Sequence, residues 1–151
     1  MKRIFFFLPI VFIFLSGLSV SGQDYRLAAG IRLSNSTPTL SNSVTGKYFI
    51  TERSAIEGLI SFGTRFGIGG LLEIYKPFSV QGLNWFYGVG AYVGFQDGDT
   101  YLGPTGILGM DYKFTNVPIN ISVDWKPELD IIPAINFVPD AFALSVRFTI
   151  K

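Results

Sequence analysis

The sequence contains no cysteine and no histidine. Without cysteine there is no disulfide, thiolate metal site or thiol nucleophile, and without histidine the commonest general base and metal ligand are missing. Charged residues are also few, at 15% of the chain, whereas an average protein has about 25%. The net charge of +1 gives no electrostatic reason for binding nucleic acid. We therefore expect no cofactor, no bound metal and no nucleic-acid partner.

Apolar residues, aromatic residues and glycine are abundant instead. Hydrophobic residues make up 48% and aromatic residues 16% of the 151 residues, and there are 17 glycines. This composition favours strands and tight turns over helices. The length allows one domain with one modest core.

The first residues have the three parts of a secretory signal peptide. Lys2 and Arg3 form a charged start, residues 4–15 are apolar, and residues 16–22 are small and polar. The apolar run is shorter than the roughly 20 residues that a membrane-spanning helix needs. We expect cleavage before Gln23, with residues 1–22 as signal peptide and 23–151 as one barrel domain. A buried N-terminal helix or an uncleaved anchor remains the alternative.

The last run of the chain alternates strictly between apolar and other residues. This period of two predicts a β-strand with one apolar face. The apolar face holds Phe142, Leu144, Val146, Phe148 and Ile150, and the opposite face holds Ala143, Ser145, Arg147 and Thr149.

Eight strand-like runs follow one another, and they predict an all-β, eight-stranded antiparallel up-and-down barrel. Connections after the first, fifth and seventh runs are long, and those after the second and sixth are short, as in outer-membrane barrels. The connection after the third run is short and the one after the fourth is intermediate, so the alternation is imperfect. We interpret residues 66–69 as a tight reversal, and residues 96–103 and 129–140 as loops. The runs are approximately 25–33, 44–51, 55–64, 70–76, 83–95, 105–114, 119–128 and 142–150.

The polar faces of these runs hold nearly all the charge, together with many glycines. Buried charges must be paired, and small residues suit the tight interior of eight strands. We therefore predict that a network of paired charges fills the lumen, which leaves no open pore. The predicted lumen network is Arg26, Arg32, Lys47, Glu57, Arg65, Glu73, Asp111, Lys113, Asp124, Lys126, Glu128 and Arg147.

The apolar faces are bulky and almost uncharged, so we predict that they face lipid in a transmembrane barrel. A closed barrel is the one arrangement of strands that leaves no backbone group unpaired in hydrocarbon. Aromatic residues near strand ends, such as Tyr25, Phe95, Phe114 and Phe142, match interfacial girdles. The predicted lipid-facing residues are Trp85, Tyr87, Val89, Val93, Leu108, Met110, Ile121, Val123, Trp125, Leu144, Val146 and Phe148.

Two stretches carry a resemblance to a known family: the segment Asp124-Trp125-Lys126-Pro127, and the ending 144–151. With the signal peptide before Gln23, they make the chain similar to the small eight-stranded outer-membrane barrels of the OmpX/OmpA type in Gram-negative bacteria. The resemblance implies residence in the outer membrane, contact with its lipid and lipopolysaccharide, and insertion by the barrel-assembly machinery. Such families usually end in an aromatic residue, whereas this chain ends Ile150-Lys151.

We expect a monomeric surface protein with a structural, adhesive or binding role and no catalysis, because the barrel enzymes of this size rely on a histidine. Two alternatives stay open: a secreted lipocalin-like barrel that binds an apolar ligand, and a small barrel enzyme acting on membrane lipid.

The loop 129–140 is unusually apolar. It either continues the strands or folds over the rim, or it forms a docking surface for a partner or lipopolysaccharide. The candidate docking residues are Ile131, Ile132, Ile135, Phe137 and Val138.

Overall fold

The computed structural model describes residues 25–35, 39–139 and 141–150, and the predicted signal peptide lies outside these ranges. Ten strands make up its regular structure. The described ranges include no helix of the length and apolar character needed to cross a membrane. The strands are β1 (Leu27–Ser34), β2 (Ser43–Phe49), β3 (Ser54–Phe62), β4 (Phe66–Pro77), β5 (Leu83–Gln96), β6 (Asp99–Lys113), β7 (Ile119–Trp125), β8 (Glu128–Asp130), β9 (Asn136–Val138) and β10 (Phe142–Ile150).

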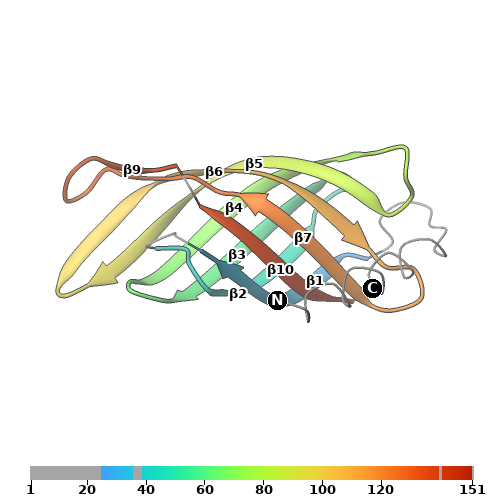
Figure 1. The fold of residues 1–151 in the computed structure, drawn as a ribbon, viewed down its shortest axis with the longest axis horizontal. Helices are drawn as coiled ribbons and strands as arrows, with labels where there is room; N and C mark the ends of the chain where they lie inside the picture. The colour runs from blue at the N-terminus through green and yellow to red at the C-terminus, as the bar shows by residue number, and fades with distance from the viewer. Residues whose placement is uncertain (1–24, 36–38, 140, 151) are drawn as a thin grey trace, which may run out of the picture.

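Eight of these strands form a closed antiparallel barrel (Figure 1). Strands β1 to β5 pair in sequence order, β10 lies between β1 and β7, and the β5–β6 pairing closes the wall. The first ladder runs from Leu27 opposite Ile150 to Ser34 opposite Ala143. Strand β10 has the predicted bounds, because its strict alternation has no interruption.

The barrel has two unlike ends. We call the rim that carries the β2–β3, β4–β5 and β6–β7 connections the turn end, and the opposite rim the loop end. The termini of the eight strands place Leu27 and Ile150 at the turn end, because an antiparallel barrel with an even strand count returns the chain to its starting side. Strands β5 and β6 extend furthest toward the loop end, since their pairing continues to Gln96 opposite Asp99.

Three of the predicted boundaries are wrong. Residues 66–69 belong to β4, and the reversal lies at residues 63–65. Most of the predicted loop 96–103 belongs to β6, because Asp97 and Gly98 make the turn alone, with φ angles of 51° and 82°. Both φ angles are positive, as a two-residue hairpin turn requires. The connection after β3 is short, as predicted, but the β5–β6 connection was predicted to be long and consists of Asp97 and Gly98 alone, which weakens the predicted separation of long loops from short turns.

The third correction concerns the seventh run. Strand β7 ends at Trp125, and after Lys126 and Pro127 the chain enters a hairpin of β8 and β9. Strand β8 continues along β6, with Glu128 opposite Thr105. Proline donates no hydrogen bond to a ladder, and the break falls at Pro127. The predicted loop 129–140 is thus largely this hairpin, which extends the wall beyond the end of β7 toward the loop end of the barrel (Figure 1).

Candidate functional site: a charged lumen inside an apolar wall

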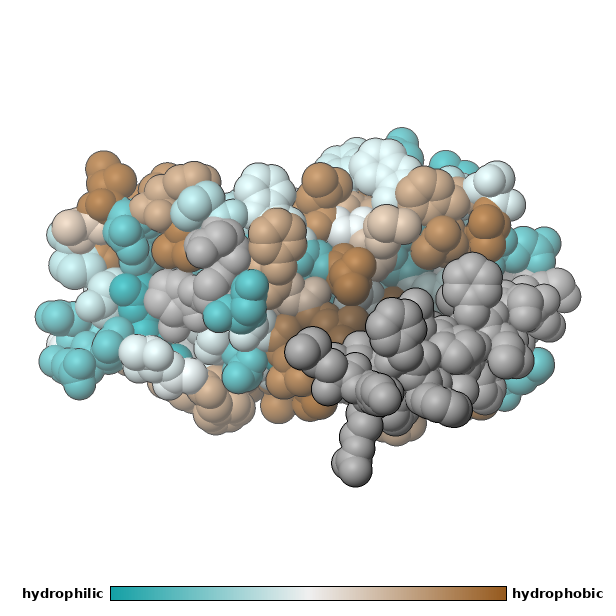
Figure 2. Space-filling view, viewed as in Figure 1, coloured by the Kyte–Doolittle hydropathy of each residue, from teal (hydrophilic) through white to brown (hydrophobic). Residues whose placement is uncertain are grey.

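The two faces of the wall differ sharply in character, and β10 shows this clearly. Ser145 and Arg147 are 0% and 1% exposed, whereas Phe148 is 64% exposed. The predicted lipid-facing residues are all exposed or half-buried on the outer face. On the face that Figure 2 shows, apolar side chains are spread over much of the barrel, and hydrophilic ones lie mostly toward its ends.

Charged side chains fill the interior instead. Among the described residues, six cationic and six anionic side chains are buried. The cations are Arg32, Lys47, Arg65, Lys113, Lys126 and Arg147, and the anions are Glu57, Glu73, Asp111, Asp124, Glu128 and Asp130.

Two residues differ from the predicted lumen set. Arg26 is exposed, because it precedes β1 and the alternation that places side chains inward begins only with the ladder at Leu27. Tyr25 is instead buried, at 3% exposure, so its assignment to an outer girdle is wrong. The sequence prediction omitted Asp130, which is buried. Asp130 continues the spacing of Asp124, Lys126 and Glu128 at every second residue, but Pro127 interrupts the strand pattern before it.

The lower part of the lumen, toward the turn end, holds two ion pairs. Arg147 Nη2 lies 2.5 Å from Glu57 Oε1, and Arg147 also donates to Ser122 Oγ at 2.8 Å. Lys47 Nζ lies 2.9 Å from Glu73 Oε2. All four charged groups are at most 1% exposed, so each depends on its partner for the stabilisation that water would otherwise give.

Aromatic rings close this part of the lumen below the ion pairs. Tyr75 donates to Glu73 at 2.8 Å and stacks on Phe86 with ring centroids 5.0 Å apart. Lys47 Nζ lies 5.0 Å from both ring centroids, and it also hydrogen-bonds to the Tyr75 hydroxyl. Phe49 packs between Tyr75 and Tyr25. The interior at the turn end is therefore filled with side chains.

The upper part, toward the loop end, holds three more ion pairs. Arg32 Nη2 lies 2.7 Å from Asp124 Oδ1, and Arg65 Nη1 lies 2.9 Å from Asp130 Oδ2. Lys126 Nζ lies 3.2 Å from Glu128 Oε1. Asp111 and Lys113, near the turn end, form no ion pair with each other in the described structure; Lys113 donates to the backbone oxygens of residues 114 and 117.

Most of the buried acidic side chains pair with cations rather than group together as metal ligands. No cluster of three acidic side chains suited to a metal ion occurs among the described residues. Five of the six buried acidic side chains are instead engaged by neighbouring cations, whereas the buried Asp111 forms no ion pair in the described structure and its carboxylate oxygens have no hydrogen-bond partner there. Comparisons with protein-family models, curated proteins and solved structures find no match.

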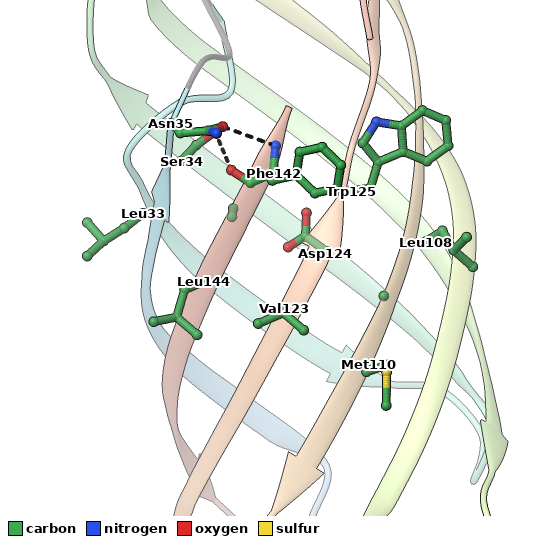
Figure 3. A pocket seen from close by; sticks show the side chains of 12 residues that line it. Leu33, Ser34, Asn35, Leu108, Met110, Val123, Asp124, Trp125, Phe142 and Leu144 are labelled. Carbon is green, nitrogen blue, oxygen red and sulfur yellow. Dashed lines mark hydrogen bonds between the residues drawn. The ribbon is translucent and has the colours of Figure 1, made fainter. Parts of the chain in front are cut away.

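The outer face carries an apolar groove of about 660 Å³ that crosses β1, β10, β7 and β6 (Figure 3). Its sides are outward side chains from successive positions of these strands, such as Leu144 and Val123 on one side and Phe142 and Trp125 on the other. Between them lies a row whose side chains turn inward, including Asp124. The groove is thus a trough between two rows of one apolar face.

The predicted docking residues lie on the β8–β9 hairpin or in its connection. Ile131, Ile132, Ile135 and Phe137 are 46–80% exposed, and Val138 is half-buried. The Trp125 indole nitrogen donates to the backbone oxygen of Pro139 beside the hairpin. The hairpin continues the strands of the wall, and its apolar side chains remain uncovered in the described structure.

Proposed function

We propose that this chain spans the bacterial outer membrane as a monomeric barrel with a structural, adhesive or surface-binding role and no catalysis. The observation that carries the proposal is the distribution of exposed charge. Every exposed charged side chain among the described residues lies at one or the other end of the barrel, and none lies on the wall between the ends. Arg26, Glu52, Arg53 and Lys76 lie at the turn end, and Asp97 and Asp99 lie at the loop end.

The height of the apolar band between these ends supports this placement. On β5, outward aromatic residues stand at Trp85 near the turn end and at Phe95 near the loop end. Ten residues at about 3.3 Å per residue give about 33 Å along the strand. At a tilt of about 40°, that length gives about 25 Å of height, which is the usual height of the apolar band in outer-membrane barrels.

Both alternative functions lack support in the described residues. A lipocalin-like barrel needs an apolar interior for its ligand, whereas this interior holds ion pairs and buried aromatic rings. A soluble barrel would also have to leave Val89 and Phe148 in water, at 69% and 64% exposure. A lipid-processing enzyme needs an activated nucleophile or base. Five of the six buried acidic side chains are held by cations, and the unpaired one, Asp111, is 0% exposed, so no substrate reaches it in this structure.

An arginine placed in the middle of the wall tests membrane placement. We expect Val89→Arg to cost about 2–4 kcal/mol in a lipid bilayer, because the charge would lie near the bilayer midplane. Val80→Arg is the matched control: Val80 is 58% exposed in the β4–β5 turn, where the cost should be about 0–1 kcal/mol. Urea unfolding of the protein in phospholipid vesicles, followed by tryptophan fluorescence, measures both.

Membrane fractionation and a heat-shift gel test the same proposal more directly. The processed chain should sediment with outer membranes, require detergent for extraction, and migrate differently on a gel before and after heating. Recovery as a soluble monomer without detergent, with equal stability for the two arginine variants, would contradict the proposal.

Contact with lipopolysaccharide is proposed through its acyl chains rather than its phosphates. The loop end presents Asp97 and Asp99, and its three described cations, Arg32, Arg65 and Lys126, are buried. Phosphate recognition needs exposed cations, and those of the described residues lie at the turn end. The assembly machinery would meet the last strand, β10, during insertion.

The β8–β9 hairpin is the proposed surface for binding at the loop end. We expect the double variant Ile135→Ser and Phe137→Ser to keep the barrel's unfolding free energy within about 1 kcal/mol, because both side chains are already exposed. Adhesion of cells that display the variant should fall, relative to cells displaying the unaltered chain at equal surface density. Unchanged adhesion would remove the docking role from the hairpin.

A further inference from the structure

Two residues of the β1–β2 connection lie inside the barrel. Thr39 and Leu40 are both 0% exposed, whereas the next residues along, Ser41 and Asn42, are half-buried and exposed. Connections normally run over the surface because their backbone groups need partners. The backbone groups of this inserted segment must therefore find partners inside the barrel.

Charged side chains of the upper lumen hold the main chain of the inserted segment. Glu128 accepts hydrogen bonds from the backbone nitrogens of Thr39 and Leu40, at 3.3 Å and 2.7 Å. Arg32 donates to the backbone oxygen of Leu40 at 2.9 Å. Arg65 donates to the Thr39 hydroxyl at 3.0 Å. Three of the four contacts thus involve peptide groups, which any extended segment possesses.

The wall beside the segment is bare. A Cβ atom added at Gly69 would lie 2.5 Å from Leu40 Cδ1, and one added at Gly94 would lie 2.7 Å from Thr39 Cγ2. At Gly67 it would lie 2.7 Å from the backbone oxygen of Thr39. Larger residues on β4 and β5 would leave no room for the segment, so these glycines shape a space that fits it.

We infer that the loop end of the lumen is a binding site for an extended peptide segment, and that Thr39 and Leu40 occupy this site as an internal plug. Side chains normally fill the interior of an eight-stranded barrel. Here three wall positions lack side chains, and Arg32, Arg65 and Glu128, each already in an ion pair, make further hydrogen bonds to the inserted segment. The site goes beyond the proposed structural role, and it exists whether or not the outer wall meets lipid.

The plug has an advantage over any peptide in solution. A segment tethered by a short connection has an effective concentration of about millimolar or more at its site. A free peptide with similar contacts would therefore bind only when the plug has been weakened. Leu40 is the side chain to remove, because it is the fully buried apolar anchor of the segment.

The test uses the full-length chain in detergent and a synthetic hexapeptide, acetyl-Thr-Pro-Thr-Leu-Ser-Asn-amide, which copies residues 37–42. We expect calorimetric titration to show binding to the Leu40→Gly variant at least about tenfold tighter than to the unaltered chain. Adding Glu128→Gln to the Leu40→Gly variant should weaken that binding by about tenfold or more, since it removes a charged acceptor of two hydrogen bonds.

Ile135→Gly is the matched control, because it removes an exposed aliphatic side chain at the same end without touching the segment. It should bind no more peptide than the unaltered chain. A heat-shift gel establishes that each variant is folded; if Leu40→Gly is not, Leu40→Ala replaces it in the same titration. The inference would be overturned by a folded Leu40 variant that binds no peptide. It would also be overturned if adding Glu128→Gln left the peptide affinity of that variant unchanged.

Discussion

Replacing Glu57 by alanine should destabilise the barrel by about 3–5 kcal/mol. The substitution leaves the Arg147 guanidinium, which is 1% exposed, without the carboxylate that lies 2.5 Å away. Ser122 and Asn120 still accept from Arg147, at 2.8 Å and 3.4 Å, but both are neutral. Urea unfolding in detergent, monitored by the fluorescence of Trp85 and Trp125, measures the change.

A second variant separates the charge effect from lost packing. In Glu57→Leu with Arg147→Met, both charges are gone and the volume is roughly kept, so the loss should be far smaller than the sum of the two single variants. Glu52→Ala removes an exposed carboxylate in the β2–β3 turn and should change stability by no more than about 0.5 kcal/mol. A Glu57→Ala variant as stable as Glu52→Ala would mean that the lumen pair contributes little.

Replacing Gly90 by valine should prevent the barrel from closing. An added Cβ would lie 1.9 Å from the backbone oxygen of Gly70 on β4, and only movement of the strand itself can relieve such a collision. Overpacking of side chains alone costs about 1–3 kcal/mol, so a clash with backbone should cost more. We expect the variant to show no heat-shifted folded band on a gel.

Gly58 provides the control for this prediction. It lies in the middle of β3 on the outer face, and an added Cβ would meet nothing within 4 Å. Gly58→Val should therefore fold normally, and a β-branched residue in an exposed strand position should even favour the strand. A folded Gly90→Val barrel with unchanged stability would show that the β4–β5 pairing tolerates separation.

Alternation predicted which side chains point inward because successive Cβ atoms of a strand lie on opposite faces. It placed Arg147 and Glu57 correctly inside, even though their mutual distance could not be read from sequence. The alternation rule failed at the two ends of the strand pattern. Arg26 lies just before the first ladder, and Asp130 lies just after a proline break, so the rule was applied too far at one end and not far enough at the other.

Glycine-rich and looped segments escaped prediction for a different reason. The run of glycines between Phe66 and Gly70 looks locally like a turn, but tertiary pairing with β3 and β5 makes it a strand. The buried position of Leu40 depends on Glu128, which lies 88 residues away in the sequence. No local pattern reports such a contact, and the polar composition around Leu40 does not distinguish a connection inserted into the lumen from one on the surface.

The equal numbers of opposite charges inside the wall have an electrical consequence. Among the described residues the six buried basic side chains match the six buried acidic ones in number, so their formal charges sum to zero. A voltage across a membrane does work only on charge that it can displace, about 2.3 kcal/mol per elementary charge per 100 mV. In the membrane placement proposed above, side chains that are held in ion pairs would therefore offer a voltage little charge to displace.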